Sequence, residues 1–173
     1  ELRAVVSRTG HNATATARLF GAAYASTDPD TVLDDPEVDA VIIATRHNLH
    51  APLVLAALKA GKHVLVEKPL CLTPAELAEI NGWLAARGDG GPILLTGFNR
   101  RFSPYAVATR NALSGRAGPI ILNYRMNAGF LPLDHWTHGS EGGGRNIGEA
   151  CHIYDLATGL IGELSPLEPL RVG

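Results

Sequence analysis

Short apolar runs alternate with helix-like stretches over the first 97 residues. The runs predict strands at 2–7, 38–44, 62–66 and 93–96. Residues 40–44 are apolar on both faces, which is typical of a parallel strand that helices cover on both sides. The stretches between the runs predict helices at 11–20, 49–60 and 74–87, and a loop with a short helix at 26–35.

Capping residues mark the helix ends. Gly21 and Gly61 are typical of residues that terminate a helix. Thr73, Pro74 and Glu76 form the pattern of a helix start, with Thr as N-cap, Pro at the first helical position and Glu three residues after the cap. The alternation of strand and helix predicts an α/β fold built on a parallel sheet.

The pattern changes after Gly97. Helices are predicted at 103–113 and 147–161, with a strand at 120–126 and a loop at 129–144 that is rich in Gly, Pro, His and Trp. We therefore expect a domain boundary at this point, with a first domain at 1–97 and a second at 98–173.

Composition and charge exclude several classes of function. Hydrophobic residues make up 46% of the chain and charged residues 18%, which is enough apolar surface to bury a core. The formal net charge is −2 and no basic stripe is present, so we expect no nucleic-acid partner. No apolar run is long enough for a bilayer span, and we expect no membrane partner. Cys71 and Cys151 are expected to be free thiols in a reducing compartment, which favours the cytoplasm.

Polar residues follow three of the predicted strands. The strand that ends at Ala44 is followed by Thr45, Arg46 and His50. The next strand is followed by residues 67–69, and the strand at 93–96 is followed by residues 98–102. Because ligands bind beyond the carboxyl ends of parallel strands, we expect these side chains to share one site. Lys68, fixed by Pro69, suits proton transfer or polarisation of a substrate oxygen; the alternative is a surface lysine paired with Glu67.

A glycine-rich run leads into the last predicted helix. Four glycines occur in residues 142–148, and a helix from 147 would place Gly148, His152 and Asp155 on one face, with Glu149 also next to His152. A histidine beside a carboxylate is a standard general acid/base, although a lone helical histidine is often structural. We expect no metal site, because the pair at 135 and 138 lacks a third ligand nearby.

These motifs together resemble the Gfo/Idh/MocA oxidoreductases. The resemblance rests on 40–45, His50, the stretch Ala-Gly-Lys-His-Val-Leu-Val-Glu-Lys-Pro at 60–69, and the glycine-rich run that ends at His152. Segments 97–104, 127–129 and 148–152 look most like the oxidoreductase half of bi-domain enzymes that also have a zinc-type alcohol-dehydrogenase-like half. The resemblance implies that 1–97 is a Rossmann domain, a doubly wound parallel sheet lacking its first strand, and that 98–173 begins an α+β substrate domain.

The resemblance also implies residue roles. Lys68 would be the catalytic lysine and His152 the acid/base, so that His152 takes the proton of a hydroxyl while Lys68 stabilises the developing alkoxide. Glu149 is a further catalytic candidate, because Gly148 occupies the place where the family commonly has an acidic residue. The cofactor would contact Ser7, Arg8, Ala44, Thr45, Arg46, His50, Glu67 and Lys68, and the substrate Arg101, Asn127, Trp136 and Arg145.

The expected cofactor is NADP or NAD, with NADP favoured. Ser7 and Arg8 end the first predicted strand, where NAD-preferring domains usually have Asp or Glu, and a guanidinium pairs well with a 2′-phosphate. Alternatively, Arg8 stacks on adenine and NAD is used. The family's first strand and G-x-G-x-x-G turn would precede Glu1, so we expect this chain alone to bind dinucleotide poorly.

The implied reaction is hydride transfer between nicotinamide and a hydroxyl-bearing carbon. The resemblance implies a sugar, cyclitol or nucleotide-sugar substrate and a homo-oligomeric full-length protein. Arg100, Arg101 and Arg125 would fit a polar or anionic substrate. Two alternatives stay open, namely an NAD-dependent glycosidase or lyase that oxidises its substrate transiently, and a nucleotide-binding sensor without catalysis.

Overall fold

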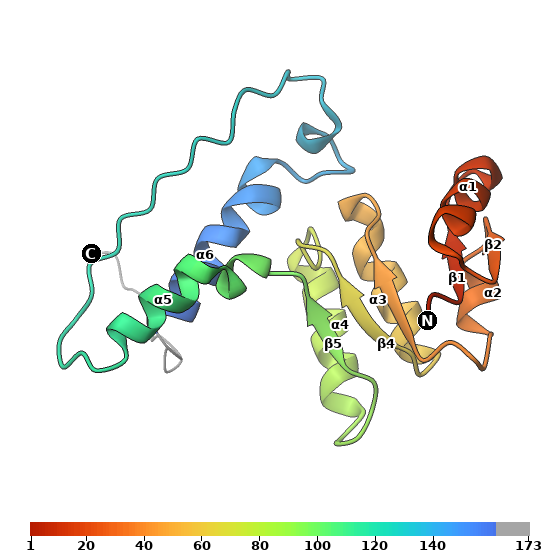
Figure 1. Ribbon diagram of the computed structural model, residues 1–173, viewed down its shortest axis with the longest axis horizontal. Helices are drawn as coiled ribbons and strands as arrows, with labels where there is room; N and C mark the ends of the chain where they lie inside the picture. The colour runs from red at the N-terminus through yellow and green to blue at the C-terminus, as the bar shows by residue number, and fades with distance from the viewer. Residues whose placement is uncertain (162–173) are drawn as a thin grey trace.

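The computed structural model describes residues 1–161 of the 173-residue chain, and strands and helices alternate along the first part (Figure 1). The order there is β1 Ala4–Val6, α1 Gly10–Phe20, β2 Tyr24–Ser26, α2 Asp30–Leu33, β3 Ala40–Ile43, the 3₁₀ turn η1 His47–Leu49, α3 His50–Lys59, β4 His63–Val66, α4 Pro74–Ala86 and β5 Leu94–Thr96. The later part contains η2 Asn99–Phe102, α5 Pro104–Leu113, η3 Trp136–His138, the π-helical turn η4 Asn146–Ala150 and α6 Cys151–Ile161.

The strands are all parallel, as predicted, but they form two separate sheets. One contains β1 and β2, and the other has the order β3-β4-β5. Ladder hydrogen bonds do not join β1 to β3 within residues 1–161. The α/β architecture is therefore confirmed, with a break between the two sheets.

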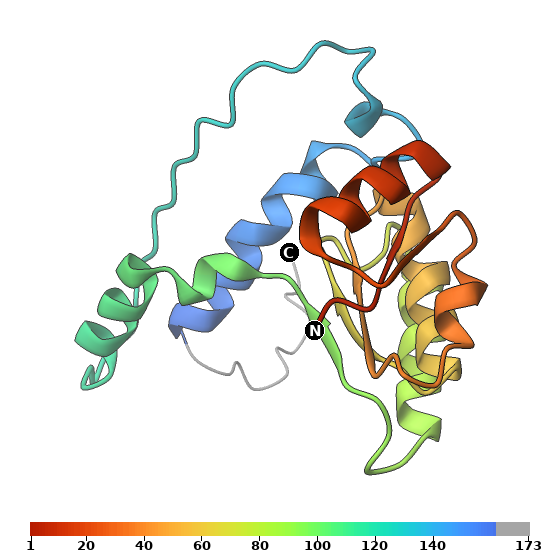
Figure 2. The same ribbon diagram turned by 45° about the vertical axis from the view of Figure 1, so that its right-hand side comes forward.

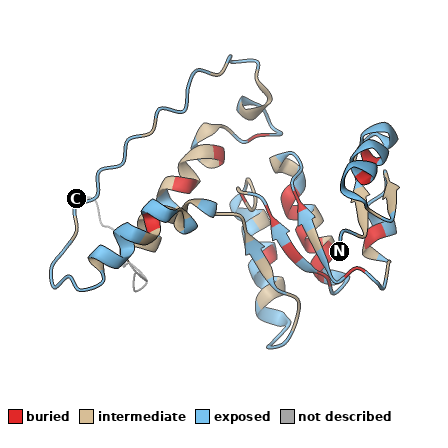
Figure 3. Ribbon diagram, in the orientation of Figure 1, coloured by how far each residue is buried: buried red, intermediate tan, exposed pale blue. Residues whose placement is uncertain are grey.

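The core lies between the three-stranded sheet and the helices α3 and α4. Ile43, Val64 and Val66 point from the sheet into a cluster that includes Val54 and Ile80. The opposite face of the sheet is open: the register partners Ile42, Leu65 and Leu95 are 72%, 37% and 57% exposed (Figure 3). The prediction that strand 40–44 is buried on both faces is wrong for this chain, because helices cover only one side.

The predicted helix ends agree with the backbone. The Thr73 hydroxyl accepts a hydrogen bond from the Glu76 amide while the Glu76 carboxylate accepts from the Thr73 amide, which is a complete capping box. Gly21 and Gly61 have φ of +69° and +76°, a conformation that glycine adopts without strain. The sequence rules for helix ends are therefore confirmed at these positions.

Two predictions about strands are wrong. Residues 24–26 form β2, although the sequence predicts no strand there. The segment is short and mixes polar with apolar residues, so it resembles a loop. Residues 120–126 form no strand; they belong to an arm, residues 119–132, that arches from α5 toward η3 away from the other elements (Figures 1 and 2). A strand needs a neighbour to share its backbone hydrogen bonds, and the described part of the chain provides none beside the arm.

Helix α6 joins the later part of the chain to the sheet. It packs on α5 and on η2, which directly follows β5 (Figure 2). The start of α6 and the turn η4 thereby lie near the carboxyl ends of β4 and β5. None of the helices in residues 1–161 combines the length and apolarity needed to cross a bilayer.

Candidate active site

The carboxyl ends of β3, β4 and β5 meet at one edge. The Glu67 amide donates to the Ile43 carbonyl at 2.9 Å, and the Gly97 amide donates to the Val66 carbonyl at 2.7 Å. These bonds continue the parallel ladder past the strand ends, so the following residues are held side by side. Thr45 and Glu67 are exposed here, and Lys68 is half-buried.

Lys68 reaches from this edge to the later part of the chain. Its Nζ donates a hydrogen bond of 2.8 Å to the carbonyl oxygen of Gly148, in η4. No ion pair between Lys68 and Glu67 forms in the described structure, so the alternative of a surface pair does not describe this lysine. An ammonium has three donors, which leaves two N–H groups for a ligand.

His152 lies one turn after Gly148 and is nearly buried. The π-helical turn η4, which contains Gly148, leads directly into α6, which contains His152 and Asp155. Burial lowers the pKa of His152 below its ordinary value, and the positive charges of Arg100 and Lys68 lower it further. Its Nδ1 is buried and has no hydrogen-bond partner among residues 1–161. The lowered pKa favours the neutral imidazole, the form that can accept a proton, at neutral pH.

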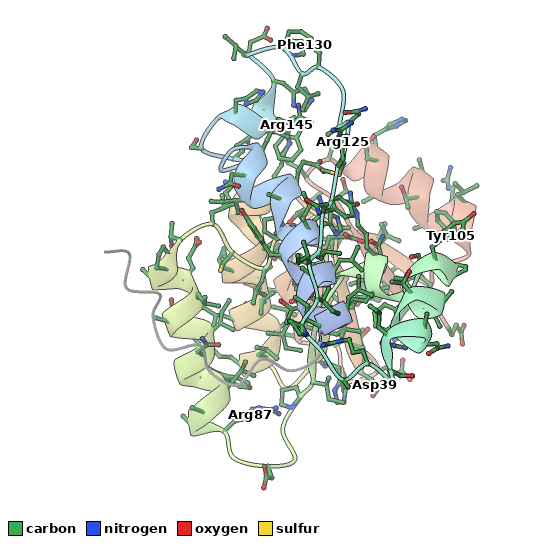
Figure 4. The ribbon with its side chains drawn as sticks, turned by 90° about the vertical axis from the view of Figure 1, so that its left-hand side faces the viewer. Asp39, Arg87, Tyr105, Arg125, Phe130 and Arg145 are labelled. Carbon is green, nitrogen blue, oxygen red and sulfur yellow. The ribbon has the colours of Figure 1, made fainter. Side chains whose placement is uncertain are left out.

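A cavity of about 130 Å³ opens beside Lys68. Four residues predicted from the sequence line it, namely Lys68, Trp136, Arg145 and Glu149. Its other walls are His47, Leu131, Thr137, Gly144 and Gly148. Arg145 lies at the end of the molecule opposite Asp39, the residue before β3, and so on the carboxyl side of the sheet (Figure 4). His152 is not a wall of this cavity.

His50 does not lie where the sequence predicts. It is fully buried, with Nδ1 2.6 Å from the Pro69 carbonyl oxygen and Nε2 3.2 Å from the Thr45 carbonyl oxygen. Both ring nitrogens face backbone carbonyls, so no part of the ring is open to a cofactor. Through these two contacts His50 instead connects the segment that follows β3 with the segment that follows β4.

Arg46 is held by the loop that contains η3. Its guanidinium forms a 3.0 Å ion pair with Glu141 and lies 4.4 Å from the ring centroid of Trp136. The Asn48 amide also donates to the Glu141 carbonyl at 3.1 Å. The sequence predicts that the charge of Arg46 faces the cofactor or substrate, but in the structure this charge is paired with Glu141.

The remaining predicted residues lie apart from the cavity. Arg101 forms a 2.6 Å ion pair with Asp155, which ties η2 to α6. Asn127 is exposed on the arm, near Gly129, whose carbonyl accepts a 2.8 Å bond from Arg145. Ser7, Arg8 and Ala44 follow their strands, and both Arg8 and Ala44 are exposed. The structure thus gathers Lys68, Glu149, Trp136 and Arg145 around the cavity, but not His152, Arg101 or Asn127.

Sequence reasoning missed His47 as a wall of this cavity. His47 lies in the same segment as Thr45 and His50, which the motif did single out. Its ring contacts the carbonyl of Gly142, which lies 95 positions later in the chain, so no local pattern indicates this contact. Within residues 1–161, no group of three or more His, Cys, Asp or Glu side chains could hold a metal ion.

Comparison with known proteins defines the class of this chain. Residues 1–89 match the profile of an oxidoreductase family with an NAD-binding Rossmann fold, and the parallel α/β architecture agrees with this class. The profile is that of Gfo/Idh/MocA, and the chain belongs to this family. The closer resemblance to bi-domain enzymes stays a prediction.

Several relatives are sugar or cyclitol dehydrogenases by name. The chain is 35% identical over 148 residues to myo-inositol 2-dehydrogenase of Thermotoga maritima, with 83% of this chain and 42% of that protein covered. It is 37% identical to the NAD⁺-linked scyllo-inositol 2-dehydrogenase of Bacillus subtilis, with 84% and 42% covered. A levoglucosan dehydrogenase solved with NADH and levoglucosan superposes with a TM-score of 0.77 at 30% identity, covering 95% and 46%. The chain spans less than half the length of each.

Proposed function

We propose that the protein transfers a hydride between a nicotinamide cofactor and a hydroxyl-bearing carbon of a sugar or cyclitol, with nucleotide-sugars as a further substrate class. The observation that carries the proposal is the hydrogen bond from Lys68 to the Gly148 carbonyl. It joins the lysine at the carboxyl edge of the sheet to the helical turn that precedes the neutral, buried His152.

The residues at the strand ends fit a dinucleotide in part. Exposed Arg8 follows β1, where an adenosine ribose would lie, and Thr45 and Glu67 follow β3 and β4, where nicotinamide would lie. A glycine-rich pyrophosphate turn is not part of this sequence. Bound nicotinamide supplies the hydride acceptor or donor. The proposal includes the division of the chain at 97/98 into the cofactor and substrate domains.

Lys68 and His152 divide the acid-base work. The free N–H groups of Lys68 stabilise the negative charge that develops on the substrate oxygen. The neutral ring of His152 accepts the hydroxyl proton when the alcohol is oxidised and returns it in the reverse direction. Glu149 lines the cavity, and its charge raises the pKa of His152, whereas burial lowers that pKa more strongly. We propose that Glu149 tunes the proton transfer to His152.

A preference for NADP over NAD rests on Ser7 and Arg8 alone. The exposed guanidinium of Arg8 can pair with a 2′-phosphate, and no carboxylate stands at the end of β1 to bind a ribose hydroxyl. The names of the relatives mention NAD⁺ or NADH. Turnover should therefore be measured with NAD and with NADP.

Lys68→Ala in the intact protein tests the proposal. We expect turnover of the active polyol to fall below detection, because the charge that stabilises the alkoxide is lost, while cofactor affinity changes little. Formation of NADH or NADPH is followed by absorbance with myo-inositol, scyllo-inositol and levoglucosan, and cofactor affinity by calorimetry.

Lys59→Ala is the matched control, because Lys59 is an exposed lysine on α3, 4.0 Å from Glu79. It should keep wild-type turnover. Turnover of Lys68→Ala within a few-fold of wild type would contradict the role of Lys68. Net reduced cofactor, formed in proportion to product, separates a dehydrogenase from a glycosidase or lyase, which returns the hydride to its oxidised intermediate and so regenerates the oxidised cofactor.

A further inference from the structure

His47 lies in the cavity wall with a defined tautomer. It is half-buried at the start of η1, and its Nδ1 lies 2.9 Å from the carbonyl oxygen of Gly142. A carbonyl oxygen only accepts hydrogen bonds, so Nδ1 carries the hydrogen. In a neutral imidazole the other nitrogen, Nε2, then holds a lone pair and can only accept. In the part of the chain that is described, no hydrogen bond reaches Nε2.

Two glycines fix the position of the His47 ring. A Cβ atom on Gly148 would lie 3.0 Å from His47 Cε1, so a larger residue would push the ring away. A Cβ atom on Gly142 would lie 2.6 Å from the Thr137 carbonyl oxygen, so glycine is also required where the ring finds its acceptor. The Trp136 ring packs edge-on against His47, with 4.9 Å between the centroids. The imidazole therefore has little freedom to turn.

His47 and Lys68 approach the same residue. Lys68 donates to the Gly148 carbonyl, and the His47 ring packs where a Gly148 side chain would stand. Both side chains line the cavity of about 130 Å³. One presents N–H donors and the other presents an acceptor. A ligand with one oxygen at Lys68 can therefore place a neighbouring hydroxyl at His47.

We propose that His47 is a substrate-binding residue whose Nε2 accepts a hydrogen bond from a hydroxyl adjacent to the reacting one, so that the site selects vicinal diols. This inference rests on the proposed function and adds the substrate class to it. An acceptor-only nitrogen binds a hydroxyl but not a methoxy group or a bare methylene, because neither can donate.

The charged groups around His47 give the proposal a pH dependence. Burial lowers the pKa of His47 most, and the charges of His50 and Lys68 lower it further, whereas the bond to Gly142 and the charge of Glu149 raise it. The neutral form therefore persists below the ordinary histidine pKa. When the pH falls through the lowered value, Nε2 becomes a donor and a cation near Lys68, and substrate binding weakens.

Two variants at position 47 separate the two ring nitrogens. His47→Asn keeps a donor near Nδ1 and removes the acceptor at Nε2; His47→Gln can keep an acceptor there. With the polyol that wild type oxidises best, we expect KM to rise about 10-fold or more in His47→Asn, the size of one lost substrate hydrogen bond, with kcat within about 3-fold of wild type. His47→Gln should recover part of the loss. His138→Asn, at an exposed histidine in η3, should match wild type.

A second measurement does not depend on turnover. In ¹⁵N imidazole spectra of the intact protein at neutral pH, the resonances that disappear in His47→Asn are those of His47. We expect their chemical shifts to be those of an Nδ1–H tautomer. Addition of the active polyol with its cofactor should shift the Nε2 signal, and a singly deoxygenated analogue lacking the adjacent hydroxyl should not.

The outcomes separate this inference from the proposed function. No turnover of any tested polyol by wild type would count against the proposed function, and the spectra would still decide the tautomer. Wild-type turnover with an unchanged KM in His47→Asn would overturn the inference and leave the proposed function standing. An Nε2–H tautomer at His47 would also overturn the inference; if His47→Asn failed to fold, the resonances lost in His47→Gln would identify the His47 ring instead.

Discussion

His152 owes its candidate role to burial. The residue is 6% exposed, and the edge-to-face contact of its ring with Phe98, at 6.2 Å between centroids, adds an apolar wall. Taking the ring out of water disfavours the imidazolium form, which lowers its pKa. A histidine that stays neutral over most of the pH range can accept a proton whenever substrate binds.

The pH dependence of alcohol oxidation follows from this burial. In the proposed function neutral His152 takes the hydroxyl proton, so kcat should stay constant as the pH falls and decline only below the ordinary histidine pKa of about 6.5. His152→Asn should abolish turnover or remove this acid limb. A pH-rate profile of kcat in the intact protein tests the expectation, and an acid limb centred above the ordinary value would contradict it.

Sequence indicates some of these side chains and not others. Lys68 and His152 belong to local motifs, so they could be singled out directly. His47 and His50 could not be assigned their contacts, because one depends on Gly142 and the other on carbonyls from two separate segments. Contacts of this kind are set by the packing of distant segments, and no residue spacing records them.

At the scale of elements, one ion pair ties α6 to the segment that follows β5. Asp155 is nearly buried and accepts a 2.6 Å bond from Arg101, which joins α6 to η2. The bond from Lys68 to η4 is a second attachment at the start of the same helix. The position of His152 therefore depends on contacts at both ends of a short helical segment.

Asp155→Asn should lower the free energy of unfolding. An amide keeps the shape of the carboxylate and an acceptor oxygen for Arg101 but loses the charge, and exchanging the ion pair for a weaker hydrogen bond costs about 1–2 kcal/mol. Urea unfolding followed by circular dichroism measures the change. Glu79→Gln, which affects an exposed 4.0 Å pair with Lys59, is the control and should change stability by about 0–1 kcal/mol. Equal effects of both variants would contradict the anchoring role.

Element boundaries were predictable wherever a local rule determines them. The capping box at Thr73 and the left-handed glycines at 21 and 61 depend only on neighbouring residues. The strand at 24–26 and the arm at 119–132 depend on whether a partner strand lies alongside. Pairing of strands is a property of the whole sheet, so apolar sequence alone gave the wrong answer in both places.

At the scale of the whole molecule, the later part of the chain meets the carboxyl edge of the sheet through the hydrogen bonds of Arg46, His47 and Lys68. The sheets and α1–α4 form one part, and α5, α6 and the arm form the other (Figure 2). The arm contacts the rest through side-chain bonds from Arg100 to Tyr124 and Met126, and from Arg145 to Gly129. The backbone of the arm has no hydrogen-bonded partner strand within residues 1–161.

This arm makes the folded protein a substrate for limited proteolysis. Arg125 is exposed on an extended segment, so trypsin should cleave after it earlier than within any helix. Mass spectrometry of a short digest should find this cut, and Arg125→Gln should remove it. A peptide spanning Arg125 that outlasts the helices would contradict the expectation. The nicked halves should still migrate together on gel filtration, because the bonds from Lys68 to Gly148 and from Arg101 to Asp155 bridge the cleavage point.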